Sequence, residues 1–356
     1  MDTLRLGVIG CGNMCKAHLE PTFGEADTIS DDVNAYADKV KVHALVDVDQ
    51  SKAEAYREAY GGEYATTDPD KVFADKDVDL VIIATWHDTH APLSLAALDG
   101  GKHVLIEKPM CMTEQECDDI VAAVKRTGLK YMPAFRCRFA KGARDVKREI
   151  PEPENVIAHA RTSGIWRETI WAQDPIKGGG QILSQGCHIV DLMFFLAGSE
   201  PESVYATGGV FHHDSDKVID TINASIRYAN GSVGAFLGGD GGTGRILAHH
   251  PLPCKCPFFV MAMDKGRSGL AIDHGHDAYF ESCVPADVWK PPYEKCIYSE
   301  DIGADRAGGV PDILPTFVKC ILEDAPLPAT EIDGARTTRF ILKCFESART
   351  GDIVEF

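Results

Sequence analysis

The sequence predicts an α/β protein with two domains: a doubly wound parallel sheet in residues 1–137, and an α+β domain with an open, largely antiparallel sheet in residues 138–356. Up to about residue 137, short apolar runs alternate with helix-forming segments, as in parallel sheets with helices on both faces. Beyond that point, longer runs alternate apolar and polar residues, as in strands with one buried face. The chain of 356 residues is long enough for both domains.

The strands predicted for the first domain are too apolar to have a solvent-exposed face. They lie at Leu4–Ile9, Val42–Val48, Val78–Thr85, His103–Ile106 and Lys130–Phe135. Helices are expected between them, and one begins at Ser51, a favoured N-cap residue followed by strong helix formers. Thr113 and Glu116 have the spacing of a capping box, which predicts a helix from Thr113 through Lys125. Residues 24–40 are expected to form a loop insertion after the first helix.

The second domain is predicted to begin with a series of long strands. Apolar residues occupy every second position from Ile222 to Tyr228, and the Asn230-Gly231 pair that follows is a strong signal for a tight hairpin. Two helices come last, and Gly351 is placed to end the second of them. The expected strands are 154–162, 202–211, 219–228, 232–238 and 257–263, and the expected helices are 310–324 and 333–349.

The composition excludes several classes of protein. Residues are 44% hydrophobic and 25% charged, which is typical of a globular protein with real cores. The net charge of −18 argues against nucleic acid or an anionic membrane as a partner. No apolar run approaches about 18 residues, and the first residues lack the pattern of a signal peptide, so a cytoplasmic location is expected. Many of the 12 cysteines are expected to be buried, small hydrophobic residues: Cys117, Cys187, Cys320 and Cys344.

A glycine-rich turn after the first strand predicts a dinucleotide-binding site in a Rossmann fold. In Gly10-x-Gly12-x-x-Cys15, the first glycine permits a tight turn and the second lets the backbone approach a pyrophosphate. The helix that begins at Asn13 and Met14 then supplies free N–H groups. The third position normally holds Gly or Ala, and Cys15 is a small substitute.

Asp47, at the end of the next strand, predicts which dinucleotide is bound. A carboxylate at this place accepts hydrogen bonds from both ribose hydroxyls and repels a 2′-phosphate, which favours NAD over NADP. Asp47 follows the glycines at more than the usual separation of about 20 residues, and the insertion at 24–40 accounts for the difference.

Four further motifs occur in an order that is specific in combination. They are Thr85-Trp86-His87-x-x-His90 after the third strand, Glu107-Lys108-Pro109 after the fourth, the run Gly178-Gly179-Gly180, and Gly186-x-His188-x-x-Asp191. Together they closely resemble the glucose–fructose oxidoreductase / inositol dehydrogenase / rhizopine-catabolism (Gfo/Idh/MocA) family. The resemblance covers nearly the whole chain, and it extends to Asp333-Gly334 before the last helix.

This resemblance implies an N-terminal Rossmann domain that binds NAD(P) and a C-terminal domain whose sheet pairs in dimers and tetramers. Family members mostly oxidise or reduce a secondary alcohol of a sugar or cyclitol. The expected partners are therefore a small carbohydrate or glycoside and further copies of the chain, as a homodimer or homotetramer. The residues expected at the cofactor are Gly10, Gly12, Asn13, Met14, Asp47, Thr85, Trp86, His87, His90, Glu107 and Lys108.

The resemblance also assigns catalytic residues. Lys108 matches the active-site lysine, His188 the catalytic histidine, and Asp191 the acid that follows it by three residues. Two positions depart from the common pattern: Ser184 stands where many members have Asp, and Thr85-Trp86-His87 replaces Thr-Pro-Asn. Ser184 therefore weakens the case for a complete Lys-Asp-His triad and for inositol as the substrate.

Alcohol oxidation needs a base for the hydroxyl proton and a cation beside the developing alkoxide. His188 suits the first role because its ordinary pKa is near neutrality, and Lys108 suits the second. Asp191 lies one helical turn from His188, where it is placed to orient the imidazole or bind a hydroxyl. The residues expected at the substrate are Lys108, Trp166, Arg167, Ser184, His188 and Asp191, since aromatic faces suit a sugar ring.

Clusters of His and Cys at 249–256 and at His274-x-His276 resemble metal sites, but the Cys254-x-Cys256 spacing is short for zinc, so no metal is expected. The leading interpretation is an NAD-dependent oxidoreductase acting on a hydroxyl of a sugar, cyclitol or glycoside. Two alternatives remain open: glycoside chemistry through transient oxidation at C3, and a non-catalytic regulator that senses NAD and sugar. Intact Lys108 and His188 argue against the regulator.

Overall fold

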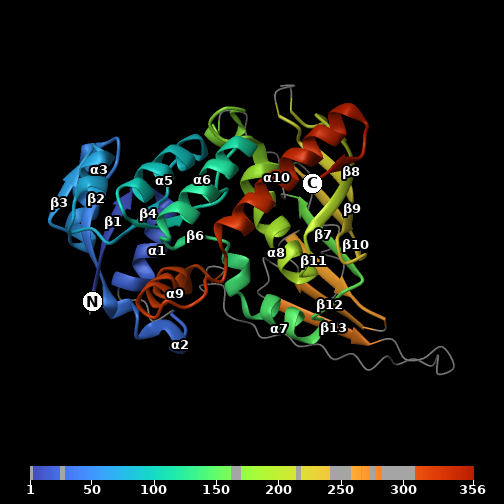
Figure 1. The fold of residues 1–356 in the computed structure, drawn as a ribbon, viewed down its shortest axis with the longest axis horizontal. Coiled ribbons are helices and arrows are strands. Elements are labelled where there is room, and N and C mark those ends of the chain that lie inside the picture. The colour runs from blue at the N-terminus through green and yellow to red at the C-terminus, as the bar shows by residue number, and fades with distance from the viewer. Residues whose placement is uncertain are drawn as a thin grey trace. The chain divides into compact units, whose positions relative to one another are not determined.

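The computed structural model of the chain describes residues 3–24, 29–161, 170–213, 218–240, 258–265, 267–272, 277–282 and 309–356. The chain forms two compact units (Figure 1). The first comprises Met1–Phe135 with Gly309–Thr338, and the second comprises Arg136–Gly308 with Arg339–Phe356. Each unit has its own sheet.

The first unit contains a six-stranded sheet in the order β3-β2-β1-β4-β5-β6, and every pairing is parallel. The order reverses between β1 and β4, and in such sheets ligands bind outside the carboxyl ends of the strands at the reversal. The strands are β1 Leu4–Ile9, β2 Val40–Val46, β3 Tyr64–Thr66, β4 Leu80–Ile83, β5 His103–Ile106 and β6 Tyr131–Pro133. The predicted doubly wound sheet is confirmed, and the short edge strand β3 adds to the five strands expected.

Helices cover both faces of this sheet, as the strand burial predicts. They are α1 Asn13–Phe23, α3 Gln50–Tyr60, α4 Pro69–Ala74, α5 His90–Asp99 and α6 Glu114–Thr127. Thr113 caps α6 in the expected capping box with Glu116. Residues 24–40 are not only a loop, because α2 Asp31–Asn34 and a short 3-10 helix at Ala37–Lys39 lie in them. Helix α9 Val310–Leu322 returns to this unit, where Asp312 accepts hydrogen bonds from the backbone N–H and hydroxyl of Ser30.

The second unit contains an eight-stranded sheet in the order β13-β12-β11-β7-β10-β9-β8-β14. Strands β7 and β10 pair in parallel and all other neighbours pair antiparallel, which confirms the largely antiparallel sheet. The strands are β7 Asn155–Arg161, β8 Pro201–Gly209, β9 Thr221–Tyr228, β10 Val233–Gly239, β11 Phe258–Met263, β12 Arg267–Ile272, β13 Asp277–Ser282 and β14 Val354–Glu355.

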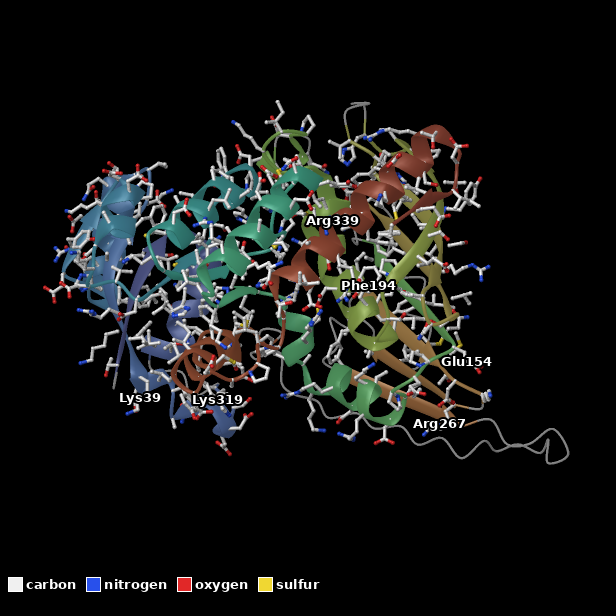
Figure 2. All side chains as sticks on the ribbon, in the orientation of Figure 1. Lys39, Glu154, Phe194, Arg267, Lys319 and Arg339 are labelled. Atoms are coloured by element: carbon white, nitrogen blue, oxygen red, sulfur yellow. The ribbon has the colours of Figure 1, made fainter. Side chains whose placement is uncertain are left out.

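The buried face of this sheet packs against α8, Cys187–Ala197, which contacts β7 and β11. Phe194 of α8 is labelled in Figure 2. Its ring meets those of Tyr228 and Phe340 edge-on at centroid distances of 6.1 and 5.2 Å. Every second residue of β9 from Ile222 is buried, as the alternation predicts. The remaining helices are α7 Lys141–Glu149 and α10 Glu331–Thr350, with 3-10 turns at Arg136–Phe139 and Trp171–Gln173 and a π-helix at Ile182–Gly186.

All eight described cysteines are buried free thiols, including the four expected to be buried. Burial raises the pKa of several of them well above the ordinary value, as it does for Cys15 and Cys344. These thiols therefore act as small packing groups rather than nucleophiles. None of the helices in the described part of the chain combines the length and apolar character that a bilayer crossing requires.

Candidate active site

The turn between β1 and α1 has the geometry that a bound pyrophosphate needs. Gly10 has a φ of +94°, and a Cβ there would lie 2.5 Å from the carbonyl oxygen of Ala84, so only glycine fits. At Gly12, a Cβ would have no described atom beyond the adjoining residues within 4 Å. Helix α1 begins there with no side-chain cap and no acidic residue in its first turn. The free N–H groups of α1 and the open space above Gly12 fit the phosphates of a dinucleotide.

Asp47 is held in place beside this turn. One oxygen of its carboxylate accepts a hydrogen bond from the backbone N–H of Cys11 at 2.8 Å. The other oxygen accepts one from the backbone N–H of Asp49 at 3.0 Å. Tyr56, from α3, donates its hydroxyl to the carbonyl oxygen of Gly12 at 3.1 Å. Each carboxylate oxygen keeps a second lone pair for a ribose hydroxyl. The geometry therefore fits the expected role of Asp47 on the ribose.

Exposed apolar side chains border the same edge of the sheet. Val48 is 96% exposed, Trp86 47% and Met14 40%, and they follow the carboxyl ends of β2, β4 and β1. Large apolar groups at a ligand-binding edge offer surface to the flat rings of a ligand. Cys15, the departure at the third glycine position, is fully buried and so allows close packing of α1.

Glu107 fixes the turn that carries Lys108. Its buried carboxylate accepts a hydrogen bond from Nε2 of His18 on α1 at 2.7 Å and another from the backbone N–H of Lys108 at 3.1 Å. Burial alone raises the pKa of this carboxyl, but the bond from His18 and the charges of His18 and Lys108 lower it to about 2. Glu107 is therefore ionised throughout the physiological range, with both oxygens engaged.

His90 ties the neighbouring loop to the same turn. Its imidazole is fully buried, with Nδ1 2.7 Å from the carbonyl oxygen of Pro109 and Nε2 3.2 Å from that of Thr85. Burial lowers the pKa of His90, so the neutral form with one N–H predominates near neutral pH. The two carbonyl oxygens hold the imidazole between the neighbouring loop and the turn. The Lys108–Pro109 peptide is cis, and Lys108 itself is largely buried.

The glycine run of the second unit packs tightly before the helix of His188. A Cβ on Gly178 would lie 2.2 Å from Cα of Ala172, and one on Gly180 would lie 2.1 Å from Cγ1 of Val218. The π-helix follows and continues directly into α8. Such π-turns are frequent at functional sites. The expected site residues of this stretch, Ser184, His188 and Asp191, are all buried.

Asp191 has a partner that the sequence did not indicate. Its carboxylate is 0% exposed and accepts two hydrogen bonds from Arg138, from Nε at 2.8 Å and from Nη2 at 2.7 Å. The guanidinium of Arg138 also lies over the ring of Phe195, 5.4 Å from its centroid. A paired carboxylate enclosed in this way is suited to holding α8 in position.

Comparison with known proteins decides the family. A family model described as "Oxidoreductase family, NAD-binding Rossmann fold" matches residues 4–135, and a model of the GFO/IDH/MocA C-terminal domain matches residues 148–243. The chain belongs to the Gfo/Idh/MocA family. It is an oxidoreductase whose N-terminal unit is an NAD-binding Rossmann domain, which confirms the resemblance, the fold class and the cofactor predicted from the motifs.

Several relatives with assigned names are dehydrogenases, and the others include a hydratase and a reductase. Inositol 2-dehydrogenase of Rhizobium meliloti (strain 1021) is 29% identical over 243 residues, which cover 64% of this chain and 66% of that protein. Levoglucosan dehydrogenase of Pseudarthrobacter phenanthrenivorans is 28% identical over 274 residues, covering 66% and 67%. The matches thus span about two thirds of these relatives. In fold, the structure of a levoglucosan dehydrogenase with NADH and L-sorbose has a TM-score of 0.82 at 22% identity, covering 100% of this chain and 99% of that one.

The predicted site residues fall into three groups. The cofactor residues gather at one edge of the first unit, and Ser184, His188 and Asp191 share one helical stretch of the second. Trp166, Arg167, the 249–256 cluster, His274 and His276 lie outside the described residues. Among the residues that are described, no three His, Cys, Asp or Glu side chains gather as a metal site would require.

Two residues of structural importance were missed in the sequence. His18 carries a usable signal, because it lies one helical turn after Cys15 on the buried face of α1. No sequence signal identifies Arg138, because its partner Asp191 lies 53 residues further along the chain.

The Asp47 carboxylate generates a prediction about cofactor choice. NAD⁺ is expected to exceed NADP⁺ by at least tenfold in kcat/KM, about 1.4 kcal/mol, because the carboxylate repels a 2′-phosphate. Steady-state rates with each cofactor give the ratio of kcat/KM with NAD⁺ to that with NADP⁺. Asp47→Ala should bring this ratio closer to one. Equal or faster turnover of wild type with NADP⁺ would contradict the role given to Asp47.

The buried Glu107 carboxylate generates a prediction about acid stability. Its pKa falls from about 4.5 to about 2 on folding, so its ionised form stabilises the fold by about 3 kcal/mol at neutral pH. This stabilisation is complete above about pH 4.5 and is lost as the pH falls toward 2. Urea unfolding should show a difference between wild type and Glu107→Gln that shrinks across this range. If the free energy of unfolding falls by the same amount with pH in wild type and Glu107→Gln, the ionised Glu107 carboxylate does not stabilise the fold.

Proposed function

We propose that the chain is an NAD-dependent dehydrogenase that oxidises a secondary hydroxyl of a sugar, cyclitol or glycoside. The observation that carries this proposal is the rigid turn at Glu107–Pro109, which holds Lys108 at the carboxyl edge of a sheet built for NAD. The named relatives act on inositol and levoglucosan, which are polyhydroxylated rings with secondary alcohols. This supports the same class of substrate here.

NAD supplies the hydride acceptor when it is bound. Lys108 donates a hydrogen bond to the substrate hydroxyl, and its positive charge stabilises the oxygen as it loses its proton. His188 receives that proton as the general base. Both groups are largely buried, and low local dielectric strengthens their action on the reacting oxygen.

Asp191 receives a different role from the one its spacing suggested. Both of its oxygens accept hydrogen bonds from Arg138, so we assign it to positioning the helix that carries His188. Ser184 remains a candidate for binding a substrate hydroxyl, since it lies one turn before His188. Its hydroxyl cannot act as the charged base that an Asp at this position would supply.

The direct test is NADH formation over a panel of inositols, pyranoses and aryl glycosides, each supplied with NAD⁺. The proposal expects at least one polyol of the panel to reduce NAD⁺ with saturation kinetics. No turnover of any cyclic polyol by protein that binds NAD⁺ would refute it.

Removing either reacting group should lower kcat far more than it weakens NAD⁺ binding. His188→Ala and Lys108→Ala are each expected to lose about 10²–10⁴-fold in kcat. The double variant should lose less than the product of the single losses, because both groups act on one proton and one oxygen. His212→Ala, an exposed histidine of the same unit, is the matched control. A folded His188→Ala protein with wild-type kcat would end the assignment.

The sheet of the second unit supports a proposal about assembly. Ile157, Leu237, Phe259 and Met261 alternate with the buried residues of β7, β10 and β11, and they stay partly exposed. A partly exposed apolar sheet face is an association surface. Light scattering should therefore show a homodimer or homotetramer, and Met261→Glu should shift it toward the monomer. A wild-type monomer at micromolar concentration would contradict this proposal.

A further inference from the structure

A buried histidine–aspartate pair, His213 and Asp240, lies in the second unit. Asp240, directly after β10, is 0% exposed, and one of its carboxylate oxygens accepts two hydrogen bonds. Nε2 of His213 lies 2.8 Å from it and the amide nitrogen of Gln173 lies 2.7 Å from it. The carboxylate therefore fixes the orientation of both side chains.

The loop that carries His213 is itself held by a second buried carboxylate. Asp220 accepts hydrogen bonds from the backbone N–H groups of Phe211, His212 and His213 at 2.8–3.1 Å. Burial raises the pKa of Asp220, but these donors lower it below the ordinary value. The loop is thus preformed, with His213 turned toward Asp240 while Phe211 and His212 are exposed.

The sheet register places this cluster at a defined end of the second unit. Gly239 of β10 pairs with Arg161 of β7 and with Thr221 of β9, so β7 ends and β9 begins beside Asp240. The glycine run before the helix of His188 adjoins the cluster, because a Cβ on Gly180 would lie 3.6 Å from Oε1 of Gln173.

Gln181 provides an independent sign of a missing polar partner. It directly follows Gly180 and is 1% exposed, and none of the described residues forms a hydrogen bond with either atom of its amide group. An unpaired buried amide costs about 1–3 kcal/mol. Such a cost is retained at functional sites when a ligand supplies the partner.

We propose that Gln173, Gln181 and His213, ordered by Asp240, form a subsite that binds substrate hydroxyl groups away from the reacting carbon. This inference rests on the proposed function. Gln181 precedes His188 by seven residues, roughly 10 Å along a helix axis. The subsite therefore binds a distant substituent or a second ring of the substrate, and does not contact the hydroxyl that is oxidised.

The chemistry of the cluster favours a neutral polyol. Amide groups both donate and accept hydrogen bonds, as hydroxyl groups do, and the ring nitrogen of a neutral imidazole that carries no proton accepts one. The buried carboxylate of Asp240 disfavours a phosphate or carboxylate ligand. A site built to bind hydroxyl groups rejects analogues that lack them, because its buried polar groups are then left unpaired.

The first test uses Gln181→Leu, a substitution of similar size. If the amide exists to bind substrate, removing it should raise the melting temperature of the free protein and lower kcat/KM by at least tenfold for the best sugar of the panel. KM for NAD⁺ should stay within twofold. A variant that is more stable and equally active on that sugar would show the amide to have no part in binding.

The second test compares His213→Gln with the matched control His212→Gln, since the two histidines are neighbours in one loop. Rates are measured on the best sugar and on its monodeoxy analogues. His213→Gln should raise KM for the parent sugar at least tenfold and leave KM for one monodeoxy analogue almost unchanged. The enzyme then no longer distinguishes the parent sugar from that analogue. His212→Gln should leave both rates within twofold.

Two outcomes overturn the proposal separately from the proposed function. If His213→Gln lowers kcat/KM by the same factor for the parent sugar and for every analogue, His213 has only a structural role. If the ratio of kcat/KM between the parent sugar and its analogues stays as in wild type, His213 has no role in binding. In both cases wild type still oxidises the sugar. If wild type oxidises no sugar, the proposed function fails, and the subsite fails with it.

Discussion

The buried carboxylate of Glu107 is the interaction on which the first unit depends. An unpaired charge in this position would cost several kcal/mol, so its partners are fixed wherever the fold is intact. One partner is His18, on the same helix whose N-terminus faces the open space above Gly12. The other is the backbone of Lys108. Helix α1 and the turn that carries Lys108 are thereby joined by one carboxylate.

In the second unit, a buried carboxylate also joins two segments, but the residues are different. The Arg138–Asp191 pair binds the first turn of this unit to the helix of His188, and a side chain at Gly178 or Gly180 would collide with its neighbours. In both units, buried charges and close backbone packing hold the segments that carry Lys108 and His188.

Local signals in the sequence predicted a large part of this arrangement. The Gly10–Gly12 turn and the Thr113 capping box each depend on residues close together in the chain, and the structure contains both. The alternation in β9 predicted a half-buried strand because strand period and burial coincide. The interactions that were missed join distant segments. His18 and Glu107 lie 89 residues apart, and no periodicity connects them.

Some strands were missed for physical reasons of their own. β3 is a three-residue edge strand whose residues are only partly buried, so it lacks an apolar signal. In β12, Ser268 and Gly269 interrupt the apolar pattern. Helical spacing puts Asp191 near His188, but it gives no sign of the ion pair with Arg138, which engages both oxygens of the carboxylate.

The central claim is that Lys108 and His188 act on one hydroxyl of a bound sugar. A crystal structure of the protein with NADH and the best sugar of the panel tests this most directly. The account predicts that the Lys108 ammonium and an imidazole nitrogen of His188 both lie within hydrogen-bond distance, about 3 Å, of the same sugar oxygen. The account is contradicted if the ordered sugar meets only one of these groups, or if a water molecule occupies the place of that oxygen.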